Sequence, residues 1–303
     1  MIRFILKIGW HAEILTERLS KHGLGLIIKA LLKIMKLICI SVIEAYLFIK
    51  YIILHLNPTP LEDNPANPIV SITSFPARIN TLWLVILSLF YQTYKPAKIL
   101  LVLTKEEFPQ GKKSLPKSLL RLEKSGVSIS FQDFNIKPHN KYYHALSTIR
   151  DRDIITVDDD LFYWPNTIEN LYILKAKHPD CICSNKTLLI SNENGNIHYK
   201  IPEPFSSGHA LMAQGVGGVL YPPEFRTKEM FNIEKIKKMC LNNDDNWLKV
   251  QEILADIKVV TGNIYPHPLF ILKSQEISLW HKNIGSGSIT VTKKLFEHYN
   301  IKL

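Results

Sequence analysis

The pattern of hydrophobic and polar positions begins with a long apolar stretch. Residues Leu24–Leu56 are almost wholly apolar, but charged residues interrupt them every few positions. A membrane-spanning helix needs about 20 nearly uncharged residues, whereas the longest uncharged run here covers only Leu37–Ile43. On a helix, four of the charged residues fall within a sector of roughly 80° and leave a wide apolar arc. They are Lys29, Lys33, Lys36 and Glu44. The pattern therefore predicts an amphipathic helix and disfavours a simple span.

From Ile69 onwards, short β-rich runs alternate with longer helical patterns. The runs that predict strands are Ile69–Thr73, Lys98–Thr104, Val127–Phe131 and Asp153–Val157. The stretches that predict helices between them are Thr81–Tyr91, Leu115–Ser125 and Tyr142–Arg150. This alternation predicts an α/β fold with a mostly parallel sheet flanked by helices. Ligands of such sheets bind beyond the carboxyl ends of the strands.

A proline-rich stretch separates the two patterns. Residues Asn57–Pro68 contain four prolines, which cannot continue a helix. We therefore expect a helical segment over residues 1–56, a linker over 57–67 and one α/β domain over 68–303.

The charge is concentrated in the helical segment. The chain has a formal net charge of +10, and residues 1–56 hold eight Lys or Arg against three Glu, about half of the surplus. An amphipathic helix of this kind lies in a membrane interface or packs its apolar arc on protein. The wide arc and the basic charges favour peripheral association with the cytoplasmic face of the inner membrane. No recognised motif accompanies the charge, so we expect no nucleic acid partner.

The four cysteines do not suggest a metal ribbon or a disulfide framework, because they form no CxxC pair and no even spacing. Cys181 and Cys183 are two positions apart and predict one face of a buried strand.

The strongest chemical signal follows the fourth predicted strand. Asp158, Asp159 and Asp160 are adjacent and would repel one another at the end of a buried strand without a compensating cation. Oxygen ligands suit Mg²⁺ and Mn²⁺, which often keep coordination sites for substrate phosphate. A solvated acidic turn that caps the next helix is the alternative.

Six segments in order resemble the bacterial GT-A glycosyltransferases, in particular the family 2-like enzymes of capsule and lipopolysaccharide synthesis. They are VSITSFPARI (70–79), SLFYQTYKPAKILLVL (88–103), HNKYYHAL (139–146), IITVDDDLFY (154–163), GVGGVLYPP (215–223) and NDDNW (243–247). The resemblance covers roughly residues 68–256 and implies a GT-A fold.

The resemblance implies where the donor nucleotide binds. It assigns the end of the first strand to the nucleotide and Asp158 or Asp159 to the ribose or to a water of the metal shell. The first-strand residues are Thr73, Ser74, Phe75 and Arg78. Arg78 and Lys141 are candidate cations for the diphosphate. The alternatives are a capping or ion-paired arginine and a solvated lysine at a helix start.

The resemblance also implies a Mn²⁺ or Mg²⁺ cofactor, with Asp158 and Asp160 as the outer residues of a DxD motif and Asp160 as the better ligand. In several GT-A enzymes a C-terminal histidine completes the metal shell, and His281 is the candidate. A surface or structural role is the alternative for His281, since the chain lacks the Asn-Asp that often precedes the last helix in such relatives.

The last two segments suggest an acceptor site. In the resembling enzymes the glycine loop borders the donor sugar and the acceptor, which here implicates Gly217 and Gly218; a plain tight turn before an edge strand is the alternative. The acidic pair Asp244 and Asp245 implies a general base, with Asp245 preferred, and Trp247 is a candidate wall for the sugar. Acidic residues also favour a helix N-terminus without any catalytic role.

These expectations combine into one function. We expect a metal-dependent, inverting glycosyltransferase that moves sugar from a nucleotide-sugar donor to a glycan or lipid-linked acceptor. A sugar nucleotidylyltransferase is an alternative, but Ser71–Ile79 lacks the glycine-rich basic loop usual in that class. A non-catalytic basic membrane-binding protein with solvated acidic clusters is the other alternative.

Overall fold

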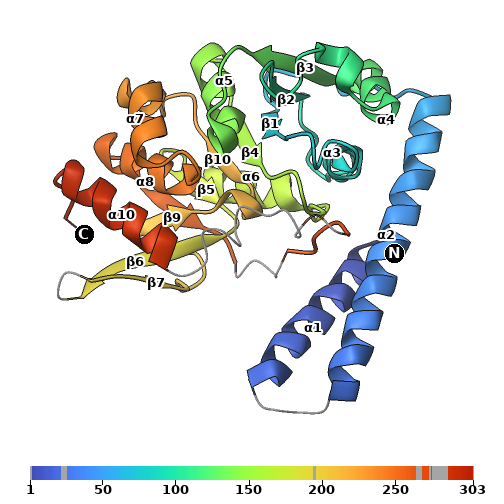
Figure 1. The fold of residues 1–303 in the computed structure, drawn as a ribbon, viewed down its shortest axis with the longest axis horizontal. Helices are drawn as coiled ribbons and strands as arrows, with labels where there is room; N and C mark the ends of the chain where they lie inside the picture. Colours follow the sequence, from blue (N-terminus) through green and yellow to red (C-terminus); the bar gives the residue numbers. More distant parts are fainter. Residues whose placement is uncertain are drawn as a thin grey trace.

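Figure 1 shows the computed structural model of the chain, in which a helical hairpin lies beside an α/β domain. The structure describes residues 2–21, 26–193, 196–263, 268–272, 274 and 286–302. The hairpin consists of α1 (Ile2–Lys21) and α2 (Leu26–Leu56).

One face of α2 belongs to the core of the α/β domain. The side chains of this face are buried in the same hydrophobic cluster as the first strand; they are Ile40, Ile43, Leu47, Tyr51 and Leu54. The Tyr51 ring lies 5.2 Å from the ring of Trp83 on α3 (Leu82–Phe90). The N-terminal helices therefore pack on protein along one face.

The opposite face of α2 is an exposed apolar strip. Its large side chains run along the whole helix, from Ile27 at 76% exposure to Leu56 at 78%. The others include Leu31, Ile34, Ile38, Val42, Ile49 and Ile53. We call this set the α2 strip.

Two lysines of α2 make contacts within the protein, Lys36 of the predicted polar sector and Lys50 outside it. Lys36 Nζ lies 2.5 Å from Glu13 on α1, and Lys50 Nζ lies 4.9 Å from the Tyr91 ring centroid. By length and composition, Ile27–Leu56 could cross a membrane, with a mean hydropathy of 2.2 and an 18-residue stretch that is 33% buried. The short uncharged runs of the sequence, by contrast, disfavour such a span.

The α/β domain is built on a mixed eight-stranded sheet in the order β3-β2-β1-β4-β10-β5-β11-β8. The strands, in this order, are Val127–Gln132, Lys98–Thr104, Ile69–Thr73, Ile154–Val157, Val219–Tyr221, Ile182–Ser184, Val259–Thr261 and Ser207–Gly208. The first four are parallel, β5 and β11 are also parallel, and β10 and β8 run against their neighbours. The predicted α/β class, a mostly parallel sheet flanked by helices, is confirmed. The glycine loop, however, precedes the interior strand β10 and not an edge strand.

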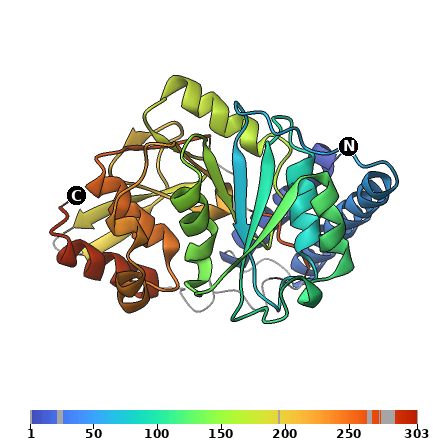
Figure 2. The same cartoon turned by 90° about the horizontal axis from the view of Figure 1, so that it is seen from above.

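Alternating side chains divide the core between the two faces of the sheet. On β2, Ile99 and Leu101 join the cluster under α2 and α3, whereas Leu100 and Val102 join the cluster on the other face. Strands covered on both sides need apolar residues at nearly every position. Figure 2 shows helices on both sides of this sheet.

The helices of the second face are α5, α7, α8 and α10. They span Asn140–Thr148, Ile233–Met239, Asp244–Leu254 and Ser286–His298. On the first face, α6 covers Thr167–Lys177, whereas the helix predicted over Leu115–Ser125 is broken into α4 (Lys117–Leu120) and η2 (Arg121–Ser125). Short 3₁₀ turns η1, η3, η4 and η5 cover Gly111–Ser114, Lys137–His139, Gly215–Gly217 and Glu229–Phe231.

A smaller sheet, in the order β7-β6-β9, accompanies the large one. Its strands are Asn196–Lys200, Thr187–Glu193 and Leu211–Ala213. Cys183 is buried on β5 as predicted, while Cys181 precedes that strand and is half-buried.

Candidate functional site

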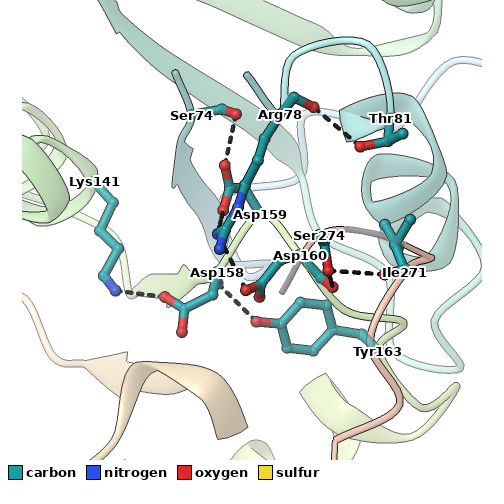
Figure 3. Close-up of polar contacts among 10 residues, drawn as sticks. All are labelled: Ser74, Arg78, Thr81, Lys141, Asp158, Asp159, Asp160, Tyr163, Ile271 and Ser274. Atoms are coloured by element: carbon teal, nitrogen blue, oxygen red, sulfur yellow. Dashed lines mark hydrogen bonds and ion pairs between the residues drawn. The ribbon is translucent and has the colours of Figure 1, made fainter. Parts of the chain in front are cut away.

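The acidic turn Asp158–Asp160 lies at the carboxyl end of β4, where the parallel sheet predicts a ligand site. The four residues of β4 are buried, so the hydrophobic strand fixes the position of the turn. Figure 3 shows how the three carboxylates diverge from it. Asp158 pairs with Lys141, whereas Asp159 and Asp160 share Arg78.

Asp159 points back into the domain. Ser74 Oγ donates to Asp159 Oδ2 (2.6 Å) and Arg78 Nη1 donates to Asp159 Oδ1 (2.6 Å). The same Arg78 nitrogen lies 3.1 Å from Asp160 Oδ2. Asp159 therefore ties the loop after β1 to the turn after β4, and Ser74 and Arg78 contact carboxylates where a nucleotide was expected.

Lys141 joins the two acidic segments. Its Nζ lies 2.6 Å from Asp158 Oδ1 and 2.8 Å from Asp244 Oδ2, and its side chain is almost completely buried. Ser71 Oγ on β1 donates to the Lys141 carbonyl (2.5 Å), which anchors the start of α5 to the sheet. Two acidic segments far apart in the sequence thus meet at one lysine.

Asp245 lies against the glycine turn beside this lysine. The Gly215 N–H donates to Asp245 Oδ1 (3.1 Å). A Cβ at Gly215 would lie 2.7 Å from Lys141 Nζ and 3.1 Å from Asp158 Oδ1. Gly215 is therefore the glycine at which a side chain would collide with the site residues. The sequence pattern predicts Gly217 and Gly218 instead.

The surroundings shift the pKa values of Asp244 and Asp245 in opposite directions. For Asp244, burial works to raise the pKa, but the Lys141 ammonium, His139 and hydrogen bonds to the carboxylate together lower it. For Asp245, burial and the neighbouring Asp244 charge hold the pKa well above its usual range. The pKa of Lys141 is raised because Asp158, Asp244 and Asp245 together outweigh its desolvation.

The acidic turn is also held by residues that sequence reasoning missed. The Asp158 N–H donates to Tyr163 Oη (2.7 Å), within the segment that carries the DxD resemblance. From the C-terminal part of the chain, the Ile271 N–H (2.9 Å) and Ser274 Oγ (3.1 Å) donate to the Asp160 carbonyl (Figure 3). No sequence signal marks Ile271 and Ser274, because their partner is a backbone carbonyl.

Four predicted site residues have structural contacts instead. Thr73 Oγ1 donates to the Val102 carbonyl (2.7 Å). A Cβ at Gly217 would lie 2.7 Å from Lys186, and Gly218 has a φ of +79°, so both serve the close packing of their turn. Trp247 is fully buried, and its Nε1 donates to the Met230 carbonyl (3.1 Å). The prediction of Trp247 as a sugar wall is wrong, because this ring lies in the core.

Phe75 is half-buried, and its ring centroid lies 5.4 Å from the Arg78 guanidinium carbon. His281 lies outside the described residues.

The oxygen-rich site fits a divalent cation that binds together with a substrate. Four carboxylates pair with two cations: Asp159 and Asp160 with Arg78, and Asp158 and Asp244 with Lys141. Burial raises the pKa of Asp159 despite the neighbouring arginine. Among the described residues, no group of three or more His, Cys, Asp or Glu side chains is placed to hold a metal. Mg²⁺ commonly takes only one or two protein carboxylates and completes its shell with water and substrate phosphate. Asp158 and Asp160 supply two such groups.

Three solved structures share a limited likeness with the chain. A mannosyltransferase from Pyrobaculum calidifontis, in complex with GDP-Man and Mn²⁺, has a TM-score of 0.42 at 9% identity, over 74% of this chain and 65% of its own. Residues 1–349 of S. aureus TarS, in complex with UDP-GlcNAc, have a TM-score of 0.42 at 12% identity, over 67% and 57%. An apo UDP-glucose pyrophosphorylase has a TM-score of 0.41 at 10% identity, over 77% and 99%.

The chain therefore spans less than two thirds of the length of the mannosyltransferase and of TarS 1–349. No protein-family model and no curated protein matches the sequence. Likenesses of this strength give no information about activity, so the function proposed below is based on the residues of the site.

Proposed function

We propose that the protein is a metal-dependent glycosyltransferase that moves a sugar from a nucleotide-sugar donor to a cell-surface glycan or glycolipid precursor. The observation that carries this proposal is that Lys141 joins the two acidic segments, through ion pairs with Asp158 and Asp244, beyond the ends of parallel strands β1 and β4. The site supplies carboxylates, Asp158 and Asp160, beside which a metal ion and a diphosphate would bind. It also supplies a separate carboxylate, Asp245, whose pKa is raised.

Each residue of the site has its own role in the proposed reaction. Asp160 and Asp158 would hold Mn²⁺ or Mg²⁺, which when bound stabilises the negative charge of a departing diphosphate. Asp245 accepts the proton of the attacking acceptor hydroxyl, as an inverting displacement requires. Lys141 keeps Asp244 ionised and positions Asp158. Gly215 leaves the space in which these groups meet.

The test compares two carboxylates near β4. Asp160→Asn removes one charged oxygen, so Mn²⁺-dependent binding of a nucleotide sugar is expected to disappear while the melting temperature stays close to that of the wild type. Asp151→Asn changes an exposed carboxylate outside the site and is the matched control. Calorimetric titration with UDP-, GDP-, CMP- and dTDP-sugars, with and without Mn²⁺, measures the effect. Unchanged Mn²⁺-dependent affinity in folded Asp160→Asn would refute the metal assignment.

A sugar nucleotidylyltransferase is the second candidate, because an acidic metal site of this kind also suits the attack of a sugar phosphate on a nucleoside triphosphate. The two reactions release different products, a nucleoside phosphate from a sugar nucleotide or pyrophosphate from a nucleoside triphosphate. Product analysis therefore distinguishes them.

We also propose that the α2 strip places the enzyme on the cytoplasmic face of the inner membrane. The strip is an uncharged apolar face that α1 and the domain leave exposed. An interfacial helix buries such a face at the boundary between headgroups and acyl chains. Acceptors carried in the membrane are then within reach of the site.

A further inference from the structure

A cavity of about 340 Å³ lies between the hairpin and the α/β domain. Its walls come from α1, α2, α3 and the segment after the acidic turn. They are formed mainly by Leu6, Ile43, Leu47, Phe162, Tyr163 and Pro165. We call this space the hairpin cavity. It is at the small end of the range of small-molecule sites, about 300–1,000 Å³, so it suits a slender apolar group and not a whole nucleotide sugar.

One edge of the hairpin cavity is basic. Arg3 lines it, together with the rings of Tyr46 and Tyr91. Lys50 Nζ lies over both rings, 5.6 Å from the centroid of Tyr46 and 4.9 Å from that of Tyr91.

A second lysine adds to this basic edge. Lys95 Nζ lies 5.6 Å from the centroid of the Tyr91 ring. Burial and the charge of Lys50 lower the pKa of Lys95. The carboxylate of Glu169, to which Thr93 Oγ1 donates (2.8 Å), also reaches this edge. Arg3 on the wall and two lysines against the lining tyrosine rings put positive charge beside apolar walls, which fits an amphiphile with an anionic head and a hydrocarbon tail.

The hairpin cavity borders the candidate active site through one side chain. The Tyr163 ring lines the cavity, and its hydroxyl accepts the N–H of Asp158 (2.7 Å; Figure 3). The Tyr163 N–H donates in turn to Ser88 Oγ (3.2 Å), which also lines the cavity. A ligand in the hairpin cavity therefore lies next to the acidic turn and on the side of the domain that carries the α2 strip.

We propose that the hairpin cavity binds the head-proximal part of the hydrocarbon chain of a lipid-linked acceptor, with the lipid phosphate against Arg3, Lys50 and Lys95. This inference rests on the proposed glycosyltransferase function and names its acceptor as a phosphate-linked single-chain lipid. The hairpin then has two tasks. The α2 strip faces the bilayer, and the inner face of α2 forms one wall of the lipid site.

The test uses a photoreactive decyl phosphate with a diazirine at the end of its chain. Full-length protein in detergent micelles is irradiated with this probe, and labelled peptides are quantified by mass spectrometry. We expect labels on the segments that contain Ile43, Leu47 and Phe162. An excess of decyl phosphate should remove them, whereas inorganic phosphate and decyltrimethylammonium should not.

Two pairs of variants test the lining. Arg3→Glu is expected to weaken decyl phosphate competition by about tenfold or more, since it replaces a charge-assisted hydrogen bond by repulsion. Lys7→Glu makes the same change of charge one turn further along α1, at an exposed position that does not line the cavity. Thr93→Trp is expected to narrow the basic edge and reduce labelling, while Thr93→Val removes the same hydroxyl without the added bulk.

Three results would overturn the inference. The label can concentrate on the exposed α2 strip, which would show general micelle contact. Inorganic phosphate can compete as well as decyl phosphate, which would leave a free-phosphate site. Arg3→Glu and Lys7→Glu can weaken decyl phosphate competition equally, which would show that only the net charge of α1 matters and not the position of Arg3. Labelling needs no sugar nucleotide, so it is independent of the calorimetric test of the proposed function. Loss of nucleotide-sugar binding with intact cavity labelling would refute only the proposed function.

Discussion

Lys141 joins both acidic segments and favours the ionised form of Asp244, because its ammonium lies 2.6 Å from Asp158 and 2.8 Å from Asp244. Asp244 is thereby kept ionised, while Asp245 has a raised pKa next to that fixed negative charge. Two neighbouring carboxylates thus acquire different properties from their surroundings. The one with the raised pKa is the better proton acceptor.

The pH dependence of transfer tests this assignment. Asp245 accepts a proton only when ionised, so activity should rise with pH through a value above the usual carboxyl pKa of about 3.9. In Asp244→Asn the neighbouring negative charge is lost, the pKa of Asp245 falls, and the rise in activity should move to lower pH. The measurement is kcat/KM against pH for both proteins. An unshifted profile would mean that Asp245 is not the titrating base.

The isosteric variant Asp245→Asn removes proton acceptance but keeps the size of the side chain. Transfer should fall by about 10²–10⁴-fold, the usual contribution of general-base catalysis, while nucleotide-sugar and Mn²⁺ binding persist. If Asp244→Asn shows this loss and Asp245→Asn does not, the base is Asp244.

Gly215 offers a separate test of the crowded site. In Gly215→Ala the new Cβ would displace the Lys141 ammonium or Asp158, so transfer should fall by about tenfold to hundredfold, as misplaced reacting groups commonly cause. Gly208→Ala is the matched control, since a Cβ there meets no atom within 4 Å. Equal activities of the two variants would show that the close approach at Gly215 is unimportant.

Helix α8 carries the acidic pair on its first turn and a buried ion pair further along. Lys249 Nζ donates to Glu252 Oε2 (2.8 Å) and to the Leu211 carbonyl (2.7 Å), and both charged side chains are almost completely buried. The pair links α8 to β9, and so fixes the helix whose N-terminus presents Asp244 and Asp245.

Breaking this pair should destabilise the protein strongly. Lys249→Met leaves Glu252 buried without its cation, which typically costs about 3–5 kcal/mol. Lys112→Met breaks a pair of similar length with Glu123 (2.6 Å) at a more exposed position, and should cost about 1 kcal/mol or less. Urea unfolding measures both values. Similar losses in the two variants would contradict the structural role of the buried pair.

The elements that the sequence predicted well are those with a strong local pattern. Strands β1 and β2 have the predicted bounds, since both are buried apolar runs with clear ends. The helix predicted over Leu115–Ser125 was wrong in its continuity, because Arg121–Ser125 forms a 3₁₀ turn that ends at Gly126 with a φ of +109°. The antiparallel insertion of β10 could not be predicted, because strand order depends on long-range pairing.

The candidate site also combines features with a local sequence pattern and features that depend on long-range contacts. Both acidic segments were found because their charges stand out beside apolar runs. Their connection through Lys141 depends on distances between distant segments, and the burial of Trp247 depends on how α8 packs. The direction of each side chain was therefore beyond the sequence pattern.

The hairpin gives the molecule two apolar surfaces, one joined to the domain core and one exposed along α2. One helix therefore contributes to the core and, in the proposed membrane attachment, also offers a face to the bilayer. The hairpin cavity lies between this helix and the acidic turn.

Vesicle binding tests the exposed surface. Replacing Ile38 and Ile49 on the α2 strip by Glu should abolish cosedimentation with anionic vesicles without a large change in melting temperature, because both side chains are more than half exposed. Ile173→Glu, at a 50% exposed isoleucine of α6, is the control and should bind as the wild type does. Basic residues near an anionic surface contribute about 1 kcal/mol each, so high salt should weaken wild-type binding. Vesicle binding by the Ile38/Ile49 variant equal to that of the wild type would contradict the attachment through α2.

The most direct test of the central claim is the product formed from each class of substrate. Full-length protein with Mn²⁺ is incubated with UDP-, GDP- and dTDP-sugars in the presence of membrane lipid extract, and separately with nucleoside triphosphates and sugar 1-phosphates. A metal-dependent glycosyltransferase should release a nucleoside diphosphate from one of the sugar nucleotides, and Asp160→Asn should abolish this release. Release of pyrophosphate from the second mixture, with no nucleoside diphosphate from the first, would contradict this function.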